Sequence, residues 1–163
     1  RTTNTERAER IRVRNSRMGL KGNWEEMSRL YAEAVRPHLI PGEELIGVVH
    51  ATHRKAFSAV SYAIGVTPGR LVMVPTNRRA EASGPPVSIS PTDVVRSSVD
   101  GFGGGFGEFL KAETGDIRIT TADTTYKLMA LGGGLDNMIT GPTQAHGKQA
   151  LVEWLWNVRH STG

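Results

Sequence analysis

Residues 101–111 read GFGGGFGEFLK, a glycine density found in loops that cradle phosphate groups. A dinucleotide-binding fingerprint needs G-x-G-x-x-G between a strand and a helix, so that the backbone approaches a pyrophosphate at the helix N-terminus. After Gly101 and Gly103, however, Phe106 occupies the position of the third glycine. The segment also lies between two strand-like runs, so its spacing argues against a phosphate site and favours a loop between strands.

The same loop carries Phe102, Phe106 and Phe109. Two interpretations stay open. In the first, the loop connects two strands and its rings pack over the edge of the sheet. In the second, the rings form an exposed apolar tip that enters a membrane or the groove of a partner, because monomers rarely display clustered aromatic rings.

Residues 141–148, GPTQAHGK, nearly spell a Walker A loop. One residue too many separates Gly141 from Gly147, and Gln149 stands where a Ser or Thr would bind magnesium. We interpret Gly141 and Pro142 as a break before the final helix. No nucleotide cofactor is expected.

The five histidines are the next candidates for catalytic or metal-binding chemistry. His50 and His53 could suggest a metal site, but on a strand they point to opposite faces of the sheet. The chain has no cysteine, no H-E-x-x-H motif and no G-x-S-x-G elbow. Thiolate zinc sites and disulfides are therefore excluded. We expect no metal, no cofactor and no enzymatic activity.

A basic segment is the strongest candidate for a binding site. Residues 54–79 contain five cations and no acidic residue. If they gather at one end of the fold, they form a site for anionic lipid headgroups, in which each charge contributes about 1 kcal/mol near an anionic membrane. The alternative is scattered surface charge. The candidates are Arg54, Lys55, Arg70, Arg78 and Arg79.

The first 21 residues carry much of the positive charge, with seven Lys or Arg against two Glu, and the rest of the chain sums to −1. On a helix, cations at spacings of 3, 4, 3 and 4 form one stripe. The stripe is either solvated or binds an anionic lipid or an acidic neighbour; nucleic acid is a poorer fit, since no recognition helix accompanies it. Its residues are Arg7, Arg10, Arg14, Arg17 and Lys21.

Two helices frame the rest of the chain. We expect one to begin at Asn23, which can cap it together with Glu26, and to end before Pro37. The other closes the chain with an apolar stripe at i, i+3, i+4 and i+7. We expect that stripe to plug one end of a barrel. It comprises Leu151, Trp154, Leu155 and Val158.

Between these helices, short β-branched runs separated by turn signals predict seven strands. Some runs alternate apolar and polar residues, whereas others are continuously apolar, as strands buried on both faces are. Seven short strands without long intervening helices favour an antiparallel barrel or sandwich. The predicted strands are residues 44–53, 62–67, 70–75, 86–90, 94–99, 116–122 and 126–131.

Three segments resemble bacterial pleckstrin-homology-like (PH-like) domains. GVTPGRLVMVP (65–75) is similar to their threonine-containing "RL" strand, VSISPTDVVRSSV (87–99) to their strand–turn–strand segment, and GDIRITTADTTYKLMAL (115–131) to the hairpin that follows. The resemblance implies an α+β, mainly β fold: a seven-stranded antiparallel barrel or sandwich capped by a C-terminal helix. Members bind phosphoinositides, other proteins or one another, and many bacterial members have no established role.

We therefore expect a PH-like domain over residues 43–163 and a basic helical extension over residues 1–42. The expected function is a non-catalytic binding module acting in protein–protein interaction or self-assembly. The alternative is peripheral binding of anionic lipid headgroups through residues 54–79 and the loop of Phe102, Phe106 and Phe109. No apolar run approaches the roughly 20 residues needed to span a bilayer, so we expect a cytoplasmic protein, at most peripheral to the inner face of the membrane.

Overall fold

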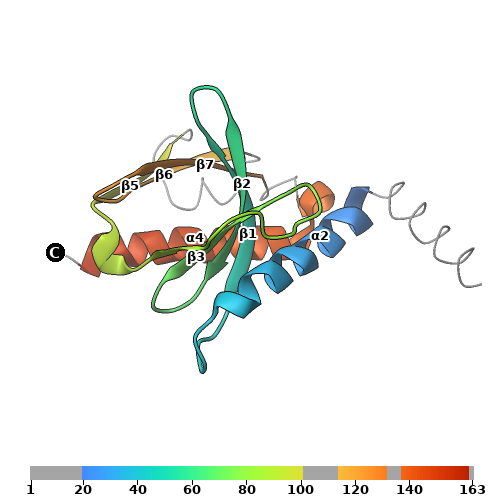
Figure 1. Ribbon diagram of the computed structural model, residues 1–163, viewed down its shortest axis with the longest axis horizontal. Helices are drawn as coiled ribbons and strands as arrows, with labels where there is room; N and C mark the ends of the chain where they lie inside the picture. Colours follow the sequence, from blue (N-terminus) through green and yellow to red (C-terminus); the bar gives the residue numbers. More distant parts are fainter. Residues whose placement is uncertain (1–19, 101–113, 132–136, 162–163) are drawn as a thin grey trace, which may run out of the picture.

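A computed structural model describes residues 20–100, 114–131 and 137–161 (Figure 1). The elements in these ranges are α2 (Leu20–Val35), η1 (Arg36–His38), β1 (Gly47–Arg54), β2 (Ala59–Val66), β3 (Leu71–Thr76), β4 (Val87–Ile89), η2 (Pro91–Asp93), β5 (Arg96–Asp100), β6 (Thr114–Thr120), β7 (Thr125–Leu131) and α4 (Asn137–Ser161). All seven predicted strands are confirmed, with ends displaced by up to a few residues.

The strands form one antiparallel sheet in the order β4-β3-β2-β1-β7-β6-β5. The first four strands and the last three are each built from consecutive hairpins, and β1 joins the two groups by pairing with β7 at Thr52 and His53 alone. The sheet curls into a half-barrel around α4 (Figure 1). The expected α+β, mainly β architecture with a C-terminal helix is confirmed.

Both faces of β1, β2 and β3 are buried, which explains their continuously apolar sequences. The inner face packs on α4 in a cluster that includes Val49, Ile64, Met73, Leu151, Trp154 and Leu155. The outer face packs on α2 in a second cluster of Tyr31, Val35, Val48, Ala63, Val72, Val74 and Ala80. A strand between two layers has no solvated face, so alternation of polar residues disappears.

The helix α2 differs from its predicted start. It begins at Leu20, so Asn23 lies within the helix and does not cap it. The capping-box pattern was misleading because residues on its N-terminal side also adopt helical backbone. The predicted end is confirmed: α2 stops at Val35, and Pro37 lies in the short helix η1 that follows. The helix packs on the sheet of its own chain through Tyr31 and Val35.

The helix α4 supplies hydrogen-bond partners to the edge of β1 that β7 leaves unpaired. The side-chain amide of Gln144 donates to the carbonyl of His50 and accepts from its N–H, both at 2.9 Å, as a neighbouring strand would. Gly147 lies so close to β1 that a Cβ there would overlap the carbonyl oxygen of Val48. Gln144 and Gly147 of the GPTQAHGK segment therefore hold α4 close against β1.

The predicted break before the final helix is also present. Gly141 has φ 80° and ψ 166°, which interrupts α4 immediately before Pro142. The helical segment that follows begins beside α2, where the Glu25 carboxylate accepts hydrogen bonds from the Thr143 N–H (3.1 Å) and hydroxyl (2.6 Å). A side chain at Gly141 would overlap this carboxylate.

Candidate functional site

The β1–β2 hairpin extends away from the body of the molecule (Figure 1). Its strands pair from Gly47–Val66 to Arg54–Ala59, and the Lys55 N–H donates to the carbonyl of Ser58 at 2.8 Å to close the turn. All residues of the turn are exposed, and Phe57 is 103% exposed. The hairpin tip, residues 54–58, thus presents a fully solvated aromatic ring beside Arg54 and Lys55.

Two other candidate cations lie in the loop after β3. Thr76, the last residue of β3, pairs with Ser61, close to the start of β2. Arg78 and Arg79 follow it at the same end of this part of the sheet as the hairpin tip. The Asn77 carbonyl oxygen Oδ1 accepts from the Arg79 N–H at 2.9 Å and orders the turn that exposes both arginines.

Arg70 lies at the opposite end of β3 and is not gathered with the other four cations. Its guanidinium donates to both carboxylate oxygens of Glu43 at 2.8 Å, to the carbonyl of His38 at 2.9 Å and to the Ser88 hydroxyl at 3.1 Å. The two side chains are 18% and 14% exposed. Hydrogen bonds from Arg70 and from the Ile40 N–H lower the pKa of Glu43 to about 2. These contacts give Arg70 a structural role at this end of the sheet.

The two strand histidines take separate positions, as predicted. His50 stacks on Tyr31 beneath α2, with ring centroids 4.8 Å apart, and burial lowers its pKa. His53 faces the inner side, where its ring lies 6.5 Å from Tyr62 and 5.5 Å from Tyr126. Among residues 20–100, 114–131 and 137–161, no group of three or more His, Asp or Glu side chains is arranged to hold a metal ion.

Two further sets of sequence candidates fall outside the described residues. They are the loop phenylalanines Phe102, Phe106 and Phe109, and the stripe cations Arg7, Arg10, Arg14 and Arg17. The fifth stripe residue, Lys21, lies in the first turn of α2. Both sets stay predictions.

Sequence reasoning missed the exposed ring of Phe57 and a group of cations on β5, β6 and β7. Arg118 and Lys127 lie directly opposite each other on β6 and β7. The turn signal TADT between them, together with alternation on both strands, is enough to place them in register. Phe57 carried a weaker signal, namely a large apolar residue inside a hairpin turn.

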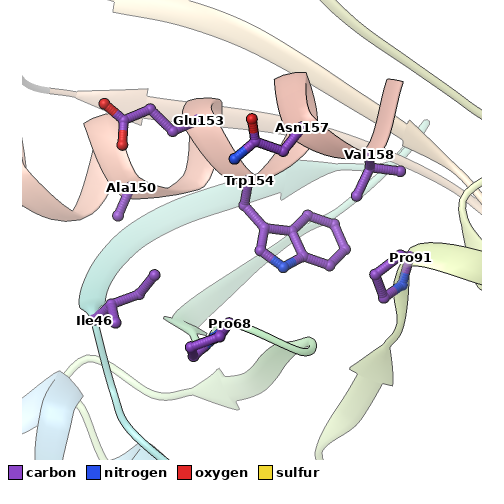
Figure 2. A pocket seen from close by; sticks show the side chains of 8 residues that line it. All are labelled: Ile46, Pro68, Pro91, Ala150, Glu153, Trp154, Asn157 and Val158. Carbon is purple, nitrogen blue, oxygen red and sulfur yellow. The ribbon is translucent and has the colours of Figure 1, made fainter. Parts of the chain in front are cut away.

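An apolar groove runs beside α4 at the end of the sheet away from the hairpin tip (Figure 2). The Trp154 ring lies between the turn residue Pro68 and Pro91 of η2, and Glu153 and Asn157 extend from the helix above it (Figure 2). The groove has a volume of about 410 Å³. Its remaining lining residues are Ile46, Ala150 and Val158. This groove can accept apolar side chains of a protein segment.

No family model and no curated protein sequence matches the chain. Its fold is similar to a PH domain within OCRL that bridges clathrin-mediated membrane trafficking to phosphoinositide metabolism, with a TM-score of 0.50, 12% identity, and coverage of 82% of this chain and 81% of that one. The hSac2 domain of the human phosphoinositide phosphatase Sac2 aligns with a TM-score of 0.46 at 12% identity, over 85% of this chain and 84% of that one. Together with the seven antiparallel strands and the capping helix, the first of these likenesses identifies the fold as PH-like.

Proposed function

We propose that this chain is a non-catalytic PH-like binding module that attaches peripherally to anionic membrane surfaces through its β1–β2 hairpin tip. One observation carries the proposal: Phe57 is entirely exposed at the end of a projecting hairpin, and Arg54 and Lys55 lie immediately before it. An apolar ring that follows two cations suits a membrane surface, where phosphate groups lie above the hydrocarbon.

The physical contributions of these residues are complementary. The cations are attracted by the negative surface potential, at about 1 kcal/mol each. The Phe57 ring loses contact with water when it enters the acyl region, which is worth about 1.5–3 kcal/mol for a fully buried side chain of this size. Arg78 and Arg79 add charge at the same end of the sheet. The sum supports reversible, salt-sensitive attachment.

The comparison supports the same class of partner. The PH domain of OCRL connects membrane trafficking to phosphoinositide metabolism. By analogy of fold, we extend a role at phosphate-bearing membranes to this chain. We place it in the cytoplasm, at the inner face of the membrane, with no cofactor. The PH-like unit would comprise residues 43–163, with residues 1–42 as a helical extension. None of the described helices is long and apolar enough to cross a bilayer.

Co-sedimentation with vesicles tests the proposal. The wild-type chain is mixed with neutral or phosphatidylserine-containing vesicles at low and high salt, beside Phe57→Ser and Lys55→Gln variants. We expect binding to anionic vesicles that weakens with salt and with either substitution. Ile40→Ser is the matched control, because Ile40 is also an exposed apolar residue (60%) but lies away from the hairpin. Equal binding of Phe57→Ser and wild type would contradict the role of the tip.

A second candidate is protein–protein interaction or self-assembly through the groove beside α4. Its apolar lining around Trp154 supports this alternative (Figure 2). Sedimentation equilibrium over a range of concentrations tests self-assembly, and substitution of Ile46, which is 37% exposed at the groove, by Glu should abolish it. A monomeric mass at every concentration would remove self-assembly from consideration.

A further inference from the structure

The exposed face of β5, β6 and β7 carries a row of cations that lies across several strands. Lys127 of β7 is directly opposite Arg118 of β6, which in turn is opposite Ser98 of β5. Arg54 of β1 directly follows the pairs Thr52–Met129 and His53–Leu128, and its guanidinium contacts the Met129 sulfur of β7. Arg96 of β5 pairs with Thr120, one diagonal step from Arg118. We call Arg54, Lys127, Arg118 and Arg96 the cationic row.

The four side chains share one face. Residues directly opposite in an antiparallel pair point to the same side, and the Arg54 guanidinium contacts the Met129 sulfur on that side at 3.8 Å. All four cations are exposed. The inner side of the same strands carries the buried residues Ile117, Ile119 and Leu128, which pack with α4. The cationic row therefore lies on the outer face, away from α4.

Two members of the cationic row are direct neighbours across a strand pair. Like charges directly opposite on neighbouring strands repel each other, and Arg118 and Lys127 are such a pair. Three acidic residues lie nearby: Asp116 and Asp100, which pair with each other in the next row, and Asp123 in the β6–β7 turn. The four cations of the row outnumber these three acids, which leaves an excess of positive charge among the described residues of this face.

The hairpin tip projects on the same side as the cationic row. In Figure 1, the β1–β2 hairpin rises past β5, β6 and β7 on the side away from α4. Arg54 belongs to both features, because it ends β1 and contacts Met129 of β7. A plane laid on the outer face would therefore meet the four cations, and Phe57 would reach beyond that plane.

We propose that the outer face of β5, β6 and β7 lies flat against an anionic lipid bilayer, with the hairpin tip inserted beside it. This inference rests on the proposed function and adds the orientation of the bound protein and three residues, Arg96, Arg118 and Lys127. The row spans four neighbouring strands at about 4.8 Å each. Cations spread over such a length fit an extended sheet of phosphates and do not converge on one headgroup.

A bilayer fits these features better than a nucleic acid does. Both present phosphates, but the bilayer also offers hydrocarbon immediately beneath them, where the Phe57 ring can be buried. Arg96 and Lys127 extend from strands with no recognition helix, so they would contact nucleic-acid phosphates alone. Binding to RNA in preference to vesicles is therefore an outcome that overturns the inference.

The first experiment measures affinity for vesicles containing phosphatidylserine. Lys127→Gln and Arg96→Gln are each compared with Arg36→Gln, which removes one exposed charge from η1. We expect about a fivefold loss of affinity for each row variant, a shallower salt dependence, and no loss for Arg36→Gln. The melting temperature of Lys127→Gln should equal that of wild type, because Lys127 is an exposed strand residue. Misfolding then cannot explain the loss.

The second experiment reads the orientation. The chain has no cysteine, so a single one can be introduced at Thr125, exposed on the row face, or at Glu44, exposed ahead of β1 at the other end. Each is labelled with an environment-sensitive fluorophore. On binding to vesicles, we expect the label at position 125 to be shielded from an aqueous quencher and the label at position 44 to stay accessible.

The outcomes separate this inference from the proposed function. If Phe57→Ser abolishes binding while the row variants match Arg36→Gln and both labels stay accessible, the tip binds and the flat orientation is wrong. If the wild-type chain binds no vesicle, both are wrong. Binding of inositol phosphates in solution without binding to vesicles, or binding to RNA alone, would also overturn the inference.

Discussion

Arg70 and Glu43 join the start of β3 to the segment before β1 through two hydrogen bonds of 2.8 Å, one to each carboxylate oxygen. The pair is partly shielded from solvent. The Thr67 hydroxyl and the Ile40 N–H also donate to this carboxylate, at 3.3 and 3.0 Å. A planar guanidinium is suited to such bidentate contacts. Arg70 therefore holds the start of β3 against the segment that precedes β1.

Replacing Arg70 should weaken the fold and leave membrane binding intact. Arg70→Gln should lower the free energy of unfolding by about 2–3 kcal/mol, because it leaves a charged acceptor without its donors. Urea denaturation measures this change, and Arg36→Gln serves as the surface control. The affinity of Arg70→Gln for vesicles, measured well below its unfolding temperature, should equal that of wild type. A large loss of affinity would mean that Arg70 belongs to the membrane-binding site.

The same pair predicts a loss of stability in acid. The pKa of Glu43 is about 2 in the folded protein, below its ordinary value of 4.5. A lowered pKa contributes stability that is complete above about pH 4.5 and is lost as the pH falls towards 2. In Glu43→Gln, the free energy of unfolding should be lower at neutral pH and should fall less between pH 5 and pH 2. An identical acid dependence in both proteins would contradict this prediction.

His50 predicts a second pH dependence at milder acidity. Burial beneath α2 lowers its pKa below the ordinary 6.5, so the folded state favours the neutral ring. Above pH 6.5 the ring is neutral in both the folded and the unfolded state, so its burial costs no stability. As the pH falls from 6.5 through the lowered pKa, the free energy of unfolding decreases. His50→Phe keeps an aromatic ring against Tyr31 and removes the titration. The difference in unfolding free energy between variant and wild type should grow in favour of the variant from pH 7 to pH 5.

Gly147 tests the close approach of α4 to β1. Gly147→Ala should lower the free energy of unfolding by about 3 kcal/mol or more, because the new methyl group must displace the backbone of Val48. Gly69→Ala is the matched control, since a Cβ there meets no atom within 4 Å. Thermal unfolding of the two variants gives the comparison. Equal melting temperatures would mean that α4 can move away from β1 without cost.

Arg78 and Arg79 test how far the membrane-binding surface extends. The double variant Arg78→Gln, Arg79→Gln should bind anionic vesicles more weakly than wild type, by up to about thirtyfold. Its stability should be unchanged, because the turn is held by the Asn77 side chain through the backbone. Full vesicle affinity in this variant would confine the surface to the hairpin tip and the row.

The strands and the final helix could be predicted from the sequence because their signals are local. The apolar stripe of Leu151 and Trp154, and the β-branched runs between turn signals, depend on neighbours a few residues away. The start of α2 could not be predicted. Asn23 and Glu26 form a local capping pattern, but the helix already begins at Leu20, on the N-terminal side of that pattern. The roles of Gln144 and Gly147 depend on contacts with His50 and Val48, far away in the chain.

The candidate site was only partly predictable for a similar reason. The excess of cations over residues 54–79 predicts a basic site that includes Arg54, Lys55, Arg78 and Arg79. The same excess also includes Arg70, because its partner Glu43 lies outside residues 54–79. The TADT turn could have paired Arg118 with Lys127 from the sequence, but the cationic row as a whole could not be predicted. Arg96 and Arg54 come from strands far away in the chain, and only the register of the sheet brings them to this face.

The contact of Gln144 with His50 also constrains how the chain folds. The two residues are 94 positions apart in the sequence. The edge of β1 beside His50 is therefore unsatisfied until the last helix has been synthesised and docked. Closing such a long loop comes late and slows folding. During synthesis, the N-terminal strands would therefore expose an open edge, at which strands of two chains can pair.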